Sequence, residues 1–138
     1  MKINIDRKRI PKTKKLAMKR ALKAMSDYIR ERDQYKCISC GNIGNKKNID
    51  AGHFFSRRYK AILFNEKNVS AQCVYCNQHL HGNWDEYYKA FINKYGIDEF
   101  KKLEADKNKL VKYTIESLFD IEKYFLLLYN KLVESMYG

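Results

Sequence analysis

Cys37-Ile-Ser-Cys40 and Cys73-Val-Tyr-Cys76 decide the fold of this 138-residue chain. Each segment places two thiols three positions apart, so that one tight turn can direct both sulfurs at the same point. Two such pairs complete a shell of four thiolates around Zn2+, with Zn–S distances of about 2.3 Å. We therefore expect one structural zinc ion held by all four cysteines. Because this shell leaves no open position for water, any chemistry requires a second site.

A redox-active pair is the alternative interpretation of a C-x-x-C sequence. That function needs only one pair and a thioredoxin-like context, which this sequence lacks. The N-terminal residues contain no apolar stretch typical of a secretory signal, and no apolar run approaches the roughly 20 residues of a membrane span. We expect a cytoplasmic location, where reducing conditions make paired cysteines metal ligands more often than disulfides.

Helical periodicity flanks the cysteine segments on both sides. Apolar residues recur at three- and four-residue steps in three places, which we predict as helices at residues 12–35, 85–95 and 114–136. A shorter helix is expected at residues 98–109, and residues 48–55 have the composition of a strand. The wide apolar face of residues 114–136 must be buried against the domain or against another subunit.

The predicted fold class is α+β and mostly helical, within one compact domain overall. We divide the chain into a basic N-terminal helical segment at residues 1–36, a zinc-stapled core at residues 37–95, and C-terminal helices at residues 96–138.

Positive charge is concentrated at the N-terminal end. The net charge of the chain is +12, and residues 1–36 carry 13 basic and 4 acidic side chains. Clustered Lys and Arg side chains bind polyanions by releasing condensed counterions from phosphates. We therefore expect DNA contacts from four residues of the first helix: Lys14, Lys15, Lys19 and Arg20. The alternative is a solvated basic helix that only improves solubility.

A second set of residues lies between and just after the cysteine pairs. His53 follows strand-like residues, Asn68 lies five positions before Cys73, and Asn77 directly follows Cys76. This order resembles the H-N-H pattern of the His-Me finger nucleases. In that family a β-hairpin carries a general-base histidine, and a following helix carries ligands for one catalytic divalent cation. The resemblance implies a ββα-metal core in this chain.

The residue types suit phosphodiester hydrolysis. A neutral imidazole can take a proton from the attacking water near pH 7, and we assign this role to His53. Asn77 and His81 are one helical turn apart, so on a helix both could face Mg2+ or Mn2+. Asn68 is expected in the turn, where its hydrogen bonds would orient the base. The alternative for His53 is a purely structural histidine.

Three basic residues follow His53 closely in the sequence. We expect Arg57, Arg58 and Lys60 to bind DNA phosphates beside the site. Ordinary solvated side chains are the alternative interpretation.

The combined pattern resembles the phage NinG/Rap recombination nucleases. The shared features occur in one order over residues 35–95: Cys-x-x-Cys, Asp50-Ala-Gly-His53, Phe64-Asn65-Glu-x-Asn68, Gln72-Cys-x-x-Cys-Asn77 and Gly82-Asn83. The resemblance implies a metal-dependent endonuclease that acts on branched DNA, such as Holliday junctions and D-loops, during phage recombination in a bacterial host cell.

One position departs from the family pattern. Most H-N-H sequences carry a metal-binding Asp or His immediately before the base, whereas this chain has Gly52. Because strand side chains alternate between faces, Asp50 shares the face of position 52. A bend at Ala51-Gly52 would draw its carboxylate towards the cation, and we therefore assign Asp50 as the acidic ligand beside Asn77 and His81. The alternative is an Asp that caps a turn.

Two other functions fit parts of the sequence. A non-catalytic zinc DNA-binding module would need neither His53 nor Mg2+, and an RNA-binding or RNA-cleaving zinc protein would be distinguished by substrate competition. If the chain does cut junctions symmetrically, two active sites are needed, so we expect a homodimer formed through residues 114–136.

Overall fold

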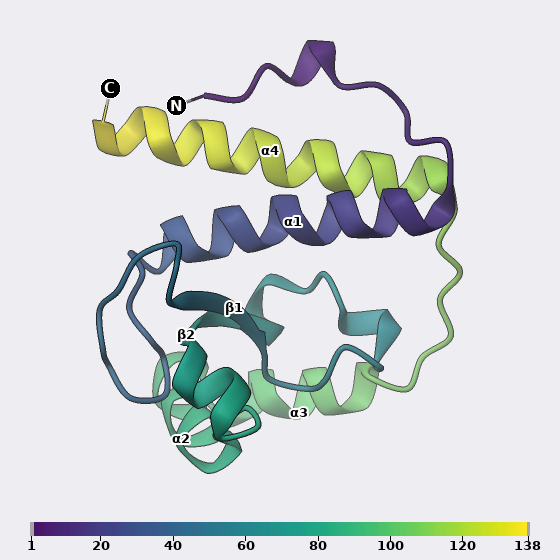
Figure 1. The fold of residues 1–138 in the computed structure, drawn as a ribbon. Coiled ribbons are helices and arrows are strands. Elements are labelled where there is room, and N and C mark those ends of the chain that lie inside the picture. The colour runs from purple at the N-terminus through teal and green to yellow at the C-terminus, as the bar shows by residue number, and fades with distance from the viewer. Residues whose placement is uncertain (1, 138) are drawn as a thin grey trace. The chain divides into compact units, whose positions relative to one another are not determined.

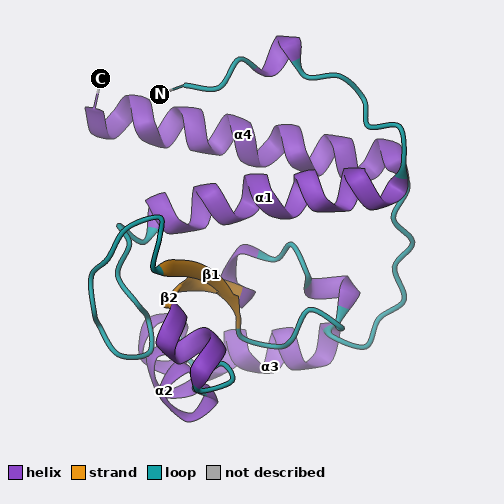
Figure 2. Ribbon diagram, viewed as in Figure 1, coloured by secondary structure: helices purple, strands orange, loops and turns teal. Residues whose placement is uncertain are grey.

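The structure is a computed structural model that describes residues 2–137 (Figure 1). The chain folds into two units: residues 2–32 with 112–137 form the first, and residues 33–111 form the second. The predicted fold class is confirmed in its coarse form, because the chain is mixed α+β and mostly helical (Figure 2). Its described residues contain one small sheet of two strands and a cluster of four cysteines.

Two long helices form most of the first unit. α1 (Lys14–Arg32) and α4 (Ile115–Tyr137) lie side by side and run in the same direction (Figure 1). The helices pack on each other, and their buried residues include small ones in α1 (Ala17, Ala21 and Ala24) and large ones in α4 (Leu118, Phe125 and Val133). Because this packing occurs within the unit, it buries much of the apolar face of α4 without a second subunit. Among residues 2–137, no helix has the length and apolar content needed to cross a membrane.

Side-chain hydrogen bonds set where both helices begin. The Thr13 hydroxyl accepts from the Leu16 backbone N–H at 3.1 Å, so α1 starts at Lys14. At the start of α4, the Ser117 N–H donates to the Thr114 hydroxyl and the Thr114 N–H donates to the Ser117 hydroxyl. This reciprocal arrangement satisfies N–H groups that have no partner within a helix.

The second unit is built on a short antiparallel ladder. β1 (Ile49–His53) pairs with β2 (Val69–Cys73), with Ile49 opposite Cys73 and His53 opposite Val69. The pairing continues through residues 51 and 52, so the bend that the sequence analysis expected there is absent from this ladder. The connecting residues 54–68 contain two short 3-10 turns rather than a tight hairpin.

Two helices follow the sheet and are joined at one glycine. α2 (Trp84–Tyr95) ends at Gly96, and α3 (Ile97–Asp106) begins directly after it. Gly96 has φ +87°, a conformation that side chains with a Cβ disfavour, so the sequence correctly marked this boundary.

An aromatic cluster forms the core of the second unit. Phe54 lies directly after β1 and stacks against Phe91 and Trp84 of α2, with ring centroids 4.8 and 5.3 Å apart. The Tyr87 hydroxyl of α2 donates to the Gly52 carbonyl oxygen at 2.7 Å. These contacts attach α2 to the end of β1, where His53 lies.

Candidate functional site

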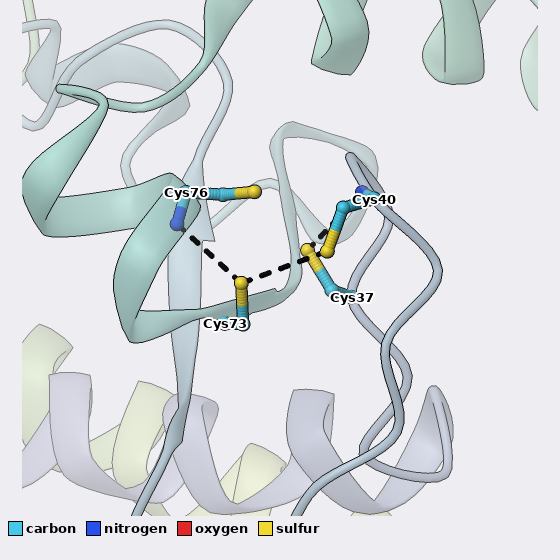
Figure 3. Close-up of side chains that lie close together, drawn as sticks. All are labelled: Cys37, Cys40, Cys73 and Cys76. Carbon is cyan, nitrogen blue, oxygen red and sulfur yellow. Dashed lines mark hydrogen bonds between the residues drawn. The ribbon is translucent and has the colours of Figure 1, made fainter.

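The four cysteines converge on one point. Their sulfurs all lie within 4.8 Å of one another, and Cys40 Sγ is 3.7 Å from Cys73 Sγ (Figure 3). In a tetrahedron with metal–sulfur distances of about 2.3 Å, neighbouring sulfurs are about 3.8 Å apart. The cluster therefore has the donor type and close to the spacing of a tetrahedral metal site, and it could bind zinc.

Each cysteine pair forms the same kind of turn. The Cys40 N–H points at Cys37 Sγ at 3.5 Å, and the Cys76 N–H points at Cys73 Sγ at 3.4 Å (Figure 3). N–H donors of this kind favour the thiolate form that binds metals.

The thiols of the cluster differ in how easily they ionise. Burial acts to raise the pKa of Cys37, but backbone hydrogen bonds outweigh it and lower this pKa. Burial raises the pKa of Cys76 to about 12, and the neighbouring Cys73 and Cys37 add to the increase. At pH 7 the Cys76 thiol is therefore protonated without a metal, so binding a divalent metal as thiolate must release its proton.

His53 ends β1, and one hydrogen bond fixes its ring. Nε2 lies 2.9 Å from the carbonyl oxygen of Leu63, which can only accept. Nε2 therefore carries the proton, and Nδ1 of the neutral ring keeps its lone pair. Burial lowers the pKa of His53 from 6.5 to about 4, the Leu63 carbonyl opposes this change, and the cations Arg57 and Lys60 add to it. The ring is thus a neutral proton acceptor at pH 7.

Asn68 holds the loop that supplies this carbonyl. Its side-chain oxygen accepts from the Phe55 N–H at 2.9 Å, and its amide nitrogen donates to the carbonyl oxygens of Phe55 and Ile62 at 3.1 and 3.4 Å. Asn68 is fully buried, so these bonds replace contacts with water. The bonds shown run to the loop rather than to His53, and Ile62, whose carbonyl oxygen accepts from Asn68, directly precedes Leu63, the partner of His53.

Asp50 and Asn77 lie next to each other. Asn77 Nδ2 and Gln78 Nε2 both donate to Asp50 Oδ2 at 2.9 Å. Rotating the Asn77 amide by 180° would place its oxygen beside the same carboxylate, which is the pair of hard oxygen donors that Mg2+ favours. The Asp50 carboxylate thus reaches Asn77 without the bend in β1 that the sequence analysis expected, and its role as a cation ligand stays a prediction.

Gln72 explains why position 52 has no side chain. A Cβ at Gly52 would collide with Gln72 Oε1, because the fully buried Gln72 side chain folds across the sheet at that point. Gln72 Nε2 donates to the Ser39 hydroxyl at 2.9 Å and to the Gly82 carbonyl oxygen at 2.6 Å. The space that a family Asp or His would occupy is thus filled from β2.

His81 is not on a helix with Asn77, and the prediction that they share a helical face is wrong. The chain forms a single π-helical turn at Tyr75–His79, and His81 lies beyond it with φ +52°. His81 instead lines a pocket of about 380 Å³ together with His53. The structure therefore pairs Asp50 with Asn77 and places His81 in the pocket of the proposed base.

Trp84 also lines this pocket, although it was not among the predicted site residues. Its ring is 44% exposed and stacks on Phe54. A single tryptophan just after Gly82-Asn83 was the available signal, but its exposure depends on packing that the sequence does not reveal.

The predicted phosphate-binding residues beside His53 are exposed. Arg57, Arg58 and Lys60 all lie on the surface, and Arg58 and Lys60 make local bonds. Arg58 Nη2 donates to the Tyr59 hydroxyl at 2.7 Å, and Lys60 Nζ donates to the Arg57 carbonyl oxygen at 2.9 Å.

The four predicted residues of α1 divide into two kinds. Lys14, Lys15 and Lys19 are exposed. Arg20 instead forms an ion pair with the buried Glu122, with Nη2 2.8 Å from Oε1 and Nε donating to Oε2 at 3.1 Å. Because this contact neutralises its charge, Arg20 has a structural role, and only the three lysines remain available for phosphates.

Comparison with known proteins identifies relatives over most of the chain. Residues 2–134 match the family described as "NinG: Bacteriophage Lambda NinG protein". Over 101 residues the chain is 39% identical to protein ninG of Escherichia phage lambda, covering 72% of this chain and 48% of that protein. It is also 39% identical to protein ninG of Salmonella phage P22, covering 72% and 49%. The chain thus spans about half the length of these curated relatives. No solved structure matches it.

Proposed function

The chain belongs to the NinG family, and from this premise we propose that it is a Mg2+-dependent DNA endonuclease of the H-N-H type. Its substrates would be branched recombination intermediates, such as Holliday junctions, in the bacterial host cell. The observation that carries this proposal is the hydrogen bond between His53 Nε2 and the Leu63 carbonyl oxygen. It supports a neutral histidine whose Nδ1 is available to accept a proton from water.

The order of the surrounding elements supports a His-Me finger core. β1 ends at the proposed base, β2 returns antiparallel to it, and a helical turn carrying Asn77 follows directly. Asn68 maintains the loop geometry through its bonds to Phe55 and Ile62. In this proposal Asn68 is a positioning residue, because it touches neither the cation nor the substrate.

The proposed hydrolysis step uses His53 as the general base. Nδ1 takes one proton from a water molecule as the water oxygen bonds to phosphorus, and the bond from phosphorus to the 3′-oxygen breaks. The 3′-oxygen then takes a proton from solvent. Asp50 and Asn77 would hold a divalent cation that neutralises phosphate charge and stabilises the leaving oxygen. His81 lines the pocket with His53, where it would contact substrate.

The cysteine cluster has a structural role in this proposal. Cys73 is both a member of the cluster and the last residue of β2, opposite the first residue of β1. Zinc bound by the four thiolates would supply folding free energy at this end of the ladder. It would thereby keep Asp50 and Gln72 in register.

A cleavage assay tests the proposal. Purified protein should cut a four-way junction in the presence of Mg2+ and leave it intact in EDTA, and linear duplex of the same sequence should be cut more slowly. His53→Ala should lower the rate by about 10² to 10⁴-fold, because a general base contributes that much, while junction binding persists. A protein that binds junctions equally well but never cuts them would instead be a zinc-containing DNA-binding module.

The role of Asp50 has a separate readout. Asp50→Asn should raise the Mg2+ concentration needed for half-maximal cleavage, because a neutral amide binds a hard cation more weakly than a carboxylate. Mn2+ binding measured by paramagnetic relaxation should weaken in the same variant, independently of activity. Unchanged Mn2+ affinity and Mg2+ dependence would remove Asp50 from the site.

A further inference from the structure

A second pocket adjoins the histidine pocket in the unit of residues 33–111. It has a volume of about 480 Å³ and is lined by residues 58–60 from the loop after β1 and by residues 107–111 after the end of α3. Arg58 and Tyr59 line both pockets. The two hollows therefore share a wall.

The lining of this second pocket is strongly basic. Four of its eight residues are cations, namely Arg58, Lys60, Lys107 and Lys109, and none is acidic. Lys109 is partly neutralised by Asp106, which lies 2.7 Å away. The sequence analysis assigned Arg58 and Lys60 to phosphates but gave no role to the lysines that follow α3.

Two of these cations share one aromatic ring. The Arg58 guanidinium lies 4.8 Å from the centroid of Tyr59, and Lys107 Nζ lies 5.1 Å from the same centroid and 4.8 Å from that of Phe55. The rings position both charges by cation–π attraction. Like charges gathered on one pocket repel each other, and an anion bound in the pocket would reduce that cost.

The pKa of Tyr59 is lowered by the same basic side chains. A hydrogen bond from Arg58 lowers the pKa of Tyr59 from 10, burial opposes this change, and the charges of Arg58 and Lys107 add to the decrease. The potential at the pocket therefore favours negative charge.

A simpler explanation accounts for only part of this arrangement. Lysines just after a helix are stabilised by the negative end of the helix dipole, which would explain Lys107 and Lys109 at the end of α3. It does not explain why Arg58 and Lys60 converge on the same hollow from a different segment.

We propose that this basic pocket, which we call the lysine pocket (residues 58–60 and 107–111), binds a phosphodiester group of the nucleic-acid strand that enters the histidine pocket. The inference rests on the proposed function and adds a second phosphate site to it. The shared wall lets one strand reach both hollows, and the exposed Trp84 ring in the histidine pocket offers a surface on which a base can stack.

A matched pair of double variants tests the lysine pocket. Lys107→Met with Lys109→Met removes two charges but keeps unbranched side chains of similar length at both positions. Lys101→Met with Lys102→Met removes two charges from exposed positions on α3, outside the pocket. Both changes alter the net charge of the protein equally, so a difference between them reports the site rather than the overall field.

Binding of the full chain to a four-way junction is measured in EDTA over a series of salt concentrations. The pocket variant should bind about tenfold more weakly than the parent and should have a salt slope smaller by about one unit, as expected when one phosphate contact is lost. The control variant should change affinity less than about threefold. Equal losses in both variants would overturn the inference.

Two further readouts separate the possible failures. Because binding is measured without a divalent cation, a parent protein that never cuts DNA with Mg2+ would overturn the proposed function while leaving this binding result interpretable. Inorganic phosphate is the probe for a free-anion site. If phosphate stabilises the parent against thermal unfolding but not the pocket variant, and both bind DNA equally, the pocket holds free phosphate and the inference is wrong.

Discussion

The two units of this chain are built from different kinds of structure. In residues 2–32 and 112–137, two long helices bury side chains that recur with helical period. In residues 33–111, two five-residue strands and several short turns surround a cluster of four cysteines and a set of stacked aromatic rings. The first unit therefore consists mainly of regular helices, and their packing joins segments about 100 residues apart in the sequence, such as Arg20 and Glu122. The second has little regular structure, and in our proposal it also depends on a metal.

Removal of the metal is expected to produce the largest difference in stability between the two units. Structural zinc in small domains contributes about 10–16 kcal/mol of binding free energy, so Cys73→Ser should unfold residues 33–111. Hydrogen exchange read by mass spectrometry should show this loss of protection, while α1 and α4 keep theirs. Metal analysis of the parent should find one zinc per chain. Soluble, active protein without zinc, or equal loss of protection in both units, would contradict this picture.

A buried charge gives the next largest effect, this time in the helical unit. Glu122 is 3% exposed and pairs with Arg20 at 2.8 Å, so Glu122→Ala leaves an unpaired cation and should lower the free energy of unfolding by about 3 kcal/mol. Asp120→Ala on the same helix removes only an exposed partner of Lys123 and should cost less than about 0.5 kcal/mol. Denaturant titration followed by helical circular dichroism measures both. Similar values for the two variants would show that the buried pair contributes little.

In the unit of residues 33–111, Asn68 is a buried polar residue whose removal can be compared with that of Glu122. Asn68→Ala leaves the N–H and carbonyl of Phe55 without their partner and should lower the stability of residues 33–111 by about 2 kcal/mol. Junction cleavage should also slow, because the Leu63 carbonyl would no longer be held against His53. The exposed Asn93 of α2 is a control position, where the same substitution should leave cleavage unchanged and alter stability by less than about 0.5 kcal/mol. If Asn68→Ala cleaves junctions as fast as the parent protein, Asn68 does not position the loop for catalysis.

The smallest expected effect concerns pH. The pKa of His53 is about 4 in the folded chain and 6.5 in the unfolded chain, so both states are neutral above pH 6.5. As the pH falls from 6.5 to 5.5, the unfolded state gains a proton while the folded state stays neutral, and stability should decrease by about 1 kcal/mol over this interval. His53→Gln should remove this part of the pH dependence. An NMR titration of the His53 ring should give a midpoint nearer 4 than 6.5, and a midpoint near 6.5 would contradict it.

Sequence reasoning was most accurate where structure is local. The helix predicted at residues 114–136 is α4, Ile115–Tyr137, and the one ending before Gly96 is α2, Trp84–Tyr95. Periodic apolar residues, Thr114 and Gly96 carry this information within a few positions. The first helix was predicted too long at its C-terminal end, because α1 ends at Arg32. Gln34 and Tyr35 adopt positive φ, which is uncommon for these residue types and could not be expected from the sequence.

The candidate site was harder to predict, because its geometry comes from long-range packing. The placement of His81 on a helix was wrong, since the chain leaves its helical turn before that residue. The glycine at position 52 looked like a missing ligand, and only the structure shows the Gln72 side chain in that space. Lys107 reaches Tyr59 across a separation of nearly fifty residues, which no local pattern encodes. By contrast, the four cysteines were found from spacing alone.

The bonds of Asn68 have an evolutionary consequence. Because Asn68 ties Phe55 to Ile62, residues 56–61 form a closed excursion whose two anchors do not depend on its length. Doubling the length of a flexible loop costs only about 0.6 kcal/mol. Arg57, Arg58 and Lys60 lie inside this excursion, whereas the histidine and its carbonyl partner lie outside it. If the chain is the nuclease we propose, its substrate preference can therefore change by insertion or deletion while the positions of His53 and Leu63 are kept, and a different recognition loop can be grafted between the same two anchors.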